Sequence, residues 1–472
     1  MKYEMIIGLE THVELATASK IFCGCPTAFG GAPNTHCCPV CTGEPGSLPV
    51  LNKKVLQYAV RAGLATNCEI ARTTHMDRKN YVYPDLPKAY QISQFDEPIC
   101  KNGRIVLENG RTIGITRIHM EEDAGKLVHE GNYTYVDYNR GGVPLIEIVS
   151  EPDLRSIEEV REYIETLQLI FRHIGVSDCR MQEGSMRCDV NISLRRFGEE
   201  KFGTRAEIKN MNSISFIEKA IAYEYARQAE LLDNGEKVVQ ETRRFNESDG
   251  TTESMRGKED AQDYRYFREP DILQIDIEEA FIEEIRAGLP ELPPAKKKRY
   301  TEVLSVPATE ASILVKYKNV ADFFDAAVAA GASAKNVCNL IIGQIFRGFN
   351  TEEEKERFAL PIRPAHLAEL VILLDSGKIT ANIAKQTLEK MLSSGRSCMD
   401  FLSASDLASV DNSEVDKLCR ESIAANPRAV ADYLAGKEAA LKALLGYVMK
   451  ATRGKANATD VEEKLKNLVS GQ

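Results

Sequence analysis

The chain has 472 residues, enough for two to four domains with cores of ordinary size. Its net charge of -10 and pI near 5.5 exclude a global basic field that would attract nucleic acid, so any RNA contact must come from a local patch. Twelve cysteines, with no signal peptide and no run of about 18 apolar residues, predict a cytoplasmic protein without a membrane span, whose thiols are free or bind metal.

The first predicted strand, IIGLETHVEL, alternates between apolar and polar side chains. Period-2 geometry places Glu10, His12 and Glu14 on one face, opposite Leu9 and Val13. Taken alone, this pattern is typical of an amphipathic strand with an ordinary solvated face.

A loop rich in glycine and proline follows, with five cysteines within nineteen residues. Two pairs of thiols in such a loop predict a structural zinc knuckle over residues 23–41. The first pair is C-x-C rather than C-x-x-C, so Cys37 or His36 remains an alternative ligand. The competing interpretation, free cysteines in a loop, would leave an oxidation liability. The expected ligands are Cys23, Cys25, Cys38 and Cys41.

Asn52 is predicted to cap a helix that ends near Asn67, and an aromatic segment punctuated by prolines comes next. This segment, DRKNYVYPDLPKAYQISQ, either holds a nucleotide or packs as a structural loop on its own tyrosines. The candidate binding residues are Lys79, Tyr81, Tyr83 and Lys88.

Acids interrupt the apolar pattern of the next two predicted strands, where an unpaired buried carboxylate would be costly. Alternation places His119 and Glu121 on one face and Glu122 on the other. A bend at the strand end could present Glu122 to the site in place of Glu121. Glu147 is the single acid within VPLIEIV. Carboxylates on neighbouring strands suit Mg²⁺, which prefers oxygen ligands and keeps waters and phosphates around it.

The segment CDVNISLR repeats the alternation, with Asp189 and Arg195 on its polar face, and Glu207 and Lys209 continue it. Four polar-lined strands together favour one shared site over four solvated faces. The alternative is an ionic network that only ties the strands together.

Helices are predicted over about 156–175 and 215–234 from their capping and stop signals. ELPPAKKKRY, residues 291–300, marks a domain boundary, and helical spacing dominates after it. A second boundary is expected near 400–410.

The last 36 residues, 437–472, hold seven Lys/Arg and four Asp/Glu, a local charge of +3 in an acidic chain. A compact basic knob suits an RNA backbone, although a solvated helix end has the same composition. The candidate RNA contacts are Lys450, Arg453 and Lys455.

Six blocks make the chain similar to the B-subunit family of aspartyl/glutamyl-tRNA amidotransferases, and the resemblance runs essentially end to end. The blocks are IGLETHVEL, DRKNYVYPDLPKAYQISQFDEPI, RIHMEEDAGK, DYNRGGVPLIEIVSEPD, EGSMRCDVNISLR and EIKNMNSISF.

The resemblance implies an α+β fold. A cradle-like catalytic domain of mostly antiparallel sheet with flanking helices is expected over 1–293, an all-α domain over 294–400 and a small helical tail domain that binds tRNA over 401–472.

The resemblance also implies a two-step reaction. ATP would phosphorylate the side-chain carboxylate of Glu on tRNA(Gln) or of Asp on tRNA(Asn), and ammonia would then displace phosphate to form the amide. We expect His12, Glu121 or Glu122, and Glu147 to bind Mg²⁺, with Glu10 close by. Asp189 and Glu207 are expected near the acyl end, and Lys209 and Arg195 are expected to neutralise phosphate.

No glutaminase signature is recognisable in the chain, so ammonia is expected from another protein. The family implies a heterotrimer with an A subunit, which hydrolyses glutamine, and a C subunit, which bridges the other two.

Two other functions compete with this interpretation. A stand-alone carboxylate-amine ligase would use the same ATP and Mg²⁺ site, but it would not need the basic tail. A zinc-stabilised RNA-binding scaffold without catalysis would leave the acidic strands unexplained.

Overall fold

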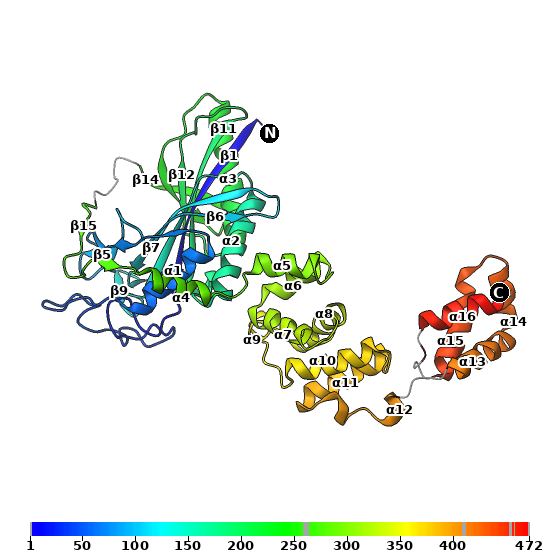
Figure 1. The fold of residues 1–472 in the computed structure, drawn as a ribbon. Helices are drawn as coiled ribbons and strands as arrows, with labels where there is room; N and C mark the ends of the chain where they lie inside the picture. Colours follow the sequence, from blue (N-terminus) through cyan, green and yellow to red (C-terminus); the bar gives the residue numbers. More distant parts are fainter. Residues whose placement is uncertain (1, 258–263, 408–411, 453–455, 457, 471–472) are drawn as a thin grey trace. The chain divides into compact units, whose positions relative to one another are not determined.

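The structure is a computed structural model that describes residues 2–257, 264–407, 412–452, 456 and 458–470 (Figure 1). Contacts divide the chain into two compact units, Met1–Leu292 and Pro293–Gln472. Each unit has its own hydrophobic core, and the second unit has two.

A nine-stranded sheet is the centre of the first unit, in the order β14-β13-β12-β11-β1-β10-β7-β6-β2. All neighbouring strands run antiparallel except β12 and β13, which are parallel. The strands are β1 (Tyr3–Glu14), β2 (Glu69–Ile70), β6 (Cys100–Val106), β7 (Thr112–Glu122), β10 (Pro144–Ser150), β11 (Met186–Arg196), β12 (Ala206–Lys209), β13 (Glu241–Asn246) and β14 (Thr251–Gly257).

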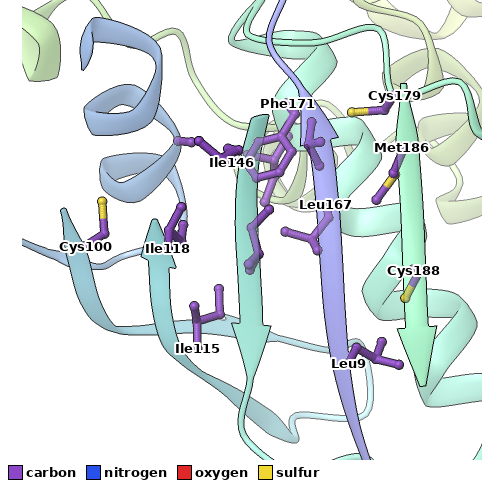
Figure 2. Packing of buried hydrophobic residues seen from close by; sticks show 14 of the residues in the cluster. Leu9, Cys100, Ile115, Ile118, Ile146, Leu167, Phe171, Cys179, Met186 and Cys188 are labelled. Atoms are coloured by element: carbon purple, nitrogen blue, oxygen red, sulfur yellow. The ribbon is translucent and has the colours of Figure 1, made fainter. Parts of the chain in front are cut away.

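Four helices supply the apolar partners of this sheet. Asn52 caps the first helix through a bond from Lys54 N, and Ser156 and Ser213 cap the next two in the same way. Figure 2 shows part of the core, where Leu167 and Phe171 pack over the sheet beside Ile146. The helices are α1 (Lys53–Ala65), α2 (Ile157–His173), α3 (Ile214–Asp233) and α4 (Glu279–Ala287).

Because strand side chains alternate, filling one face of the sheet with apolar residues directs the polar set to the other face. Leu9 and Val13 are buried in the core, while Glu10 and His12, between them along the strand, are only half-buried. This division separates the residues that stabilise the fold from those available for chemistry.

Three smaller sheets complete the first unit: β15 (Phe267–Arg268) with β4 (Asp77–Asn80) and β5 (Tyr90–Ser93), β16 (Ile275–Asp276) with β3 (Thr73–Thr74), and β8 (Lys126–Glu130) with β9 (Tyr133–Asp137). Side chains at β5 fix the end of β7. Gln94 Oε1 accepts a bond from Met120 N at 2.9 Å, and Gln91 Nε2 donates to Glu122 O at 2.7 Å.

In the described part of the second unit, all elements of regular secondary structure are helices. Its elements are α5 (Pro293–Glu302), α6 (Ala308–Lys316), α7 (Lys318–Ala329), α8 (Ala334–Gly343), η3 (Ile345–Gly348), α9 (Glu352–Arg357), α10 (Pro364–Asp375), α11 (Ala381–Ser394), η4 (Cys398–Asp400), α12 (Ala404–Leu407), α13 (Asn412–Ala425), α14 (Pro427–Leu434), η5 (Glu438–Ala440), α15 (Leu441–Ala451) and α16 (Ala458–Ser470). One core runs from Tyr300 to Cys398 and another from Val415 to Leu465. The predicted α+β class with a helical C-terminal part is confirmed.

No helix in the described part of the chain combines the length and the hydropathy needed to cross a membrane.

Candidate functional site

The metal-ligand cluster, His12, Glu121 and Glu147, lies on the polar face of the central strands. His12 pairs with Glu147, and Glu147 pairs with His119, so one row of side chains crosses β1, β10 and β7. His12 Nε2 lies 3.4 Å from Glu121 Oε1 and 3.7 Å from Glu147 Oε2, and His119 Nε2 lies 3.0 Å from Glu147 Oε2. Residues more than a hundred positions apart therefore meet because the antiparallel register aligns them.

The charges of this cluster favour a cation. One ligand atom each from His12, Glu121 and Glu147 lies within 4.8 Å of the others, although the two carboxylates carry like charge. Burial raises the pKa of Glu147, but the hydrogen bond from His119 and the nearby positive charges outweigh burial and lower it below its usual range. A divalent ion fits this donor set, because it would compensate two ionised carboxylates held away from water.

Glu122 is not part of this cluster. Alternation directs its side chain away from Glu121, where Lys88 Nζ donates to its two oxygens at 2.5 and 2.6 Å. Ile92 N also donates to Glu122, at 2.9 Å. The structure therefore places Glu121, and not Glu122, with His12, and it places the Lys88 ammonium on Glu122.

A second group, the Lys209 cluster, lies two strands further along the sheet. Lys209 Nζ is 2.7 Å from Asp189 Oδ2 and 2.8 Å from Glu207 Oε1. Burial raises the pKa of Glu207, but the Lys209 charge and its hydrogen bond lower it overall. The structure brings these three residues together on the sheet.

Glu10 lies on β1, the strand that also carries His12, and it faces β11 of the Lys209 cluster. It pairs in register with Asp189, and Asn191 Nδ2 donates to its Oε1 at 2.9 Å. Burial, and then the charges of Glu147 and Glu207, raise the pKa of Glu10. Glu10 is thus a half-buried acid whose pKa responds to charges of both clusters.

Arg195 is further away than its place on the polar strand suggested. It pairs with Glu4, six residues from the Glu10–Asp189 pair, and so lies about 20 Å along the strand from it. Its guanidinium Nε bonds Glu4 at 2.7 Å. The expectation that Arg195 neutralises a phosphate beside Lys209 is not supported by this placement, because alternation fixes the face of a side chain but not its distance along the strand.

The candidate nucleotide residues are placed in different surroundings. Lys79 Nζ lies 4.9 Å from the centre of the Tyr264 ring, and the Tyr81 ring lies 5.8 Å from the same ring. Burial and the charges of several neighbours, Glu121 among them, raise the pKa of Tyr81. Tyr83 is exposed.

Tyr264 and Tyr266 also belong to this region, although the sequence pattern does not indicate it. Nearly 150 residues separate them from Glu121 in the sequence, and their only signal was the aromatic spacing in DYRYF.

The four predicted thiols form the second group that fits a metal. Ligand atoms of Cys23, Cys25, Cys38 and Cys41 lie within 4.8 Å of one another, and the Cys37 thiol lies instead 3.9 Å from Asn139 Oδ1. Four sulfur ligands without an open position suit structural zinc.

Lys20 accompanies this group, although no local pattern around it predicts this. Its fully buried ammonium lies 3.6 Å from Cys41 Sγ and donates to Tyr138 O at 3.0 Å. Hydrogen bonds from Cys23 and neighbouring groups, with the Lys20 charge, lower the pKa of Cys41 to about 4, although burial opposes this. A buried cation beside a thiolate is consistent with an anionic metal–sulfur centre.

Of the predicted RNA contacts, Lys450 is exposed near the end of α15. Arg453 and Lys455 lie outside the described residues.

The fold and the site together define a class of protein, the GatB/GatE catalytic proteins. The model of the GatB/GatE catalytic domain matches residues 5–283, and the model of the GatB domain matches residues 322–469. The chain belongs to the family of aspartyl/glutamyl-tRNA(Asn/Gln) amidotransferase B subunits.

Relatives with that name match this chain over almost its whole length. The protein of Carboxydothermus hydrogenoformans is 51% identical over 475 residues, which cover 99% of this chain and 98% of the relative. The protein of Caldicellulosiruptor saccharolyticus is 52% identical over 474 residues, 99% of each chain. The protein of Lachnoclostridium phytofermentans is 51% identical over 474 residues, again 99% of each.

Proposed function

We propose that this chain is the component of a cytoplasmic tRNA-dependent amidotransferase that activates a carboxylate with ATP and then amidates it. One observation carries the proposal: His12, Glu147 and His119 are paired in register across three strands, and Glu121 lies beside them. The chain that holds this row is similar throughout to amidotransferase B subunits. The substrates would be Glu-tRNA(Gln), Asp-tRNA(Asn) or both, and the products Gln-tRNA(Gln) and Asn-tRNA(Asn).

The side-chain carboxylate must be activated before ammonia can replace its oxygen, because hydroxide is a poor leaving group. The γ-phosphoryl group of ATP would pass to the side-chain carboxylate, releasing ADP, and ammonia would attack the carbonyl while phosphate leaves with its electron pair. His12, Glu121 and Glu147 would hold Mg²⁺, which neutralises phosphate charge and orients the transferring group. Lys209 would neutralise negative charge near the acyl end, with Asp189 and Glu207 fixing its position.

Glu10 would accept a proton from ammonia after attack, because it is on the same strand as His12 and pairs in register with Asp189 of the Lys209 cluster. Replacing Glu10 by Gln should slow amide formation with free ammonia and with glutamine alike. Unchanged activity with both nitrogen sources would exclude this role.

The tetrathiolate group would hold a structural zinc ion that fastens the loop of residues 23–41 to the sheet. Four protein ligands leave no position for substrate. Zinc would therefore stabilise the site and would not take part in the reaction.

Ammonia would come from a glutaminase A subunit, with a C subunit completing a heterotrimer. We assign catalysis to residues 1–293, a connecting helical domain to 294–400 and tRNA binding to the tail, 401–472. The separate cores of the helical unit support this division, because each can be stable without the other. Lys450 and the basic residues after it in the sequence would contact the tRNA backbone.

The test is release of γ-phosphate from ATP by the heterotrimer, with and without Glu-tRNA(Gln), for wild type and Glu147→Gln. We expect tRNA to stimulate release in the wild type and the variant to lose the stimulation. Full tRNA-dependent release by the variant would mean that the acids of this face are structural. Stimulation by free glutamate in place of tRNA would instead indicate a small-molecule ligase.

A further inference from the structure

Three aromatic rings form a stack at the end of β5. The Phe95 and Tyr266 rings lie 4.2 Å apart at 9°, and the Tyr264 ring meets Tyr266 edge-on at 6.0 Å. Phe95 is fixed by a bond from its backbone N to Asp77 Oδ2 at 2.7 Å. We call Phe95, Tyr264 and Tyr266 the aromatic stack.

The stack is held rigidly, although two of its rings come from a segment distant in sequence. Arg78 makes a two-point bond to Glu269, at 2.6 and 2.9 Å, and Glu269 is fully buried. Asn80 N donates to Tyr264 O at 3.0 Å. The segment also joins β4 as strand β15, at the edge of the small sheet β15-β4-β5 whose β15 and β5 are labelled in Figure 1. These bonds fix the rings before any ligand arrives, so little freedom is lost on binding.

The stack retains accessible ring surface and lies near the metal-ligand cluster. Phe95 is 51% exposed, which is unusual for a ring whose only role is to fill a core. Burial, and then the charges of Tyr264, Glu121 and Glu147, raise the pKa of Tyr266, so its hydroxyl lies within electrostatic reach of these carboxylates. Accessible aromatic surface next to charged ligands suits a flat, weakly polar group attached to a phosphate.

We propose that the aromatic stack is a platform on which an adenine ring lies during the reaction. The proposal rests on the proposed function, whose substrates carry adenine in two places: in ATP and in the terminal adenosine that bears the aminoacyl ester. Aromatic side chains bind single-stranded bases by stacking, and Lys79, 4.9 Å from the Tyr264 ring, supplies a cation at the edge of the platform for a phosphate.

The test uses the heterotrimer with Tyr266→Leu, Tyr266→Phe and the matched control Tyr133→Leu, an exposed tyrosine on the β8–β9 hairpin. KM values for ATP and for Glu-tRNA(Gln) are measured separately, with kcat and Tm. We expect Tyr266→Leu to raise one of the two KM values at least about tenfold, and Tyr266→Phe and Tyr133→Leu to stay within about twofold of wild type. The KM that rises identifies the source of the adenine.

Two results would overturn the platform. One is a Tyr266→Leu variant with both KM values unchanged, and the other is a loss of kcat and Tm alone, which would make the stack only a support for β15. Titration calorimetry of the same variants with ADP and with uncharged tRNA gives an independent readout. If the wild type forms no amide, the proposed function fails, whereas weaker binding of either probe to Tyr266→Leu alone would still support the platform.

Discussion

Lys88 binds Glu122 on the side of β7 opposite to the one where Glu121 meets His12, so two consecutive glutamates serve different sites. Both partners of the Lys88–Glu122 pair are largely buried. Removing one partner of such a pair leaves the other charge buried without compensation.

Glu122→Gln should therefore destabilise the protein by about 3–5 kcal/mol, measured by chemical unfolding. Lys88→Met combined with Glu122→Met should recover much of that loss, because neither charge remains. Glu121→Gln should leave stability nearly unchanged and weaken Mg²⁺ or Mn²⁺ binding in a calorimetric titration. The reverse pattern, with Glu122→Gln weakening metal binding and Glu121→Gln unfolding the protein, would exchange the two assignments.

Lys209→Met should lower the stability of the protein more at neutral pH than at acidic pH. Lys209 lowers the folded-state pKa of Glu207, so it adds stability that is present above the unfolded pKa of about 4.3 and is lost as pH falls through the lower folded value. The variant lacks this contribution.

The Tm difference between wild type and Lys209→Met should accordingly be larger at pH 7 than at pH 3.5. Lys201→Met, on the exposed loop after β11, serves as the control and should show no such trend. An equal loss of Tm at both pH values would mean that Lys209 stabilises the protein by packing alone.

The sequence could predict the face of each site residue, because alternation depends only on strand geometry. Glu10, His12 and Glu147 could be grouped in this way, and the cysteine spacing predicted the thiol group. Alternation also favoured Glu121 over Glu122, which is how the structure places them. Each of these patterns lies within one short segment, although His12 and Glu147 come from segments more than a hundred positions apart.

The distance along a strand and the contacts between remote segments could not be predicted. Arg195 lies on a polar strand, but the register brings it to Glu4, away from Lys209. Tyr266 reaches Phe95 because β15 pairs with β4, a contact that no local pattern specifies. Lys20 is fully buried and contacts both Cys41 and Tyr138, which its neighbours in the sequence do not indicate.

Lys20→Met should accelerate loss of zinc from the thiol group. The Lys20 ammonium is the buried charge beside Cys41, and a tetrathiolate zinc centre carries a net charge of about -2. Groups that contact metal ligands typically change metal affinity by about 10–100-fold when they are replaced.

Zinc release to a chromophoric chelator, at constant temperature, measures this effect directly. Lys54→Met, an exposed lysine on α1, is the matched control and should release zinc at the wild-type rate. If Lys20→Met released zinc at the wild-type rate, the buried ammonium would stabilise the contact with Tyr138 O and not the thiol group.

Lys450→Ala should weaken tRNA binding through lost phosphate contact. A lysine that neutralises one phosphate releases about one counterion, so its removal should reduce the slope of log K against log salt by about one. The measurement is equilibrium binding of tRNA to the heterotrimer at several salt concentrations. Lys442→Ala, two turns earlier on α15, removes the same charge from another part of the helix and should leave the slope unchanged. Equal effects from both lysines would indicate diffuse attraction by the +3 tail. No effect from Lys450→Ala would show that Lys450 does not contact the RNA.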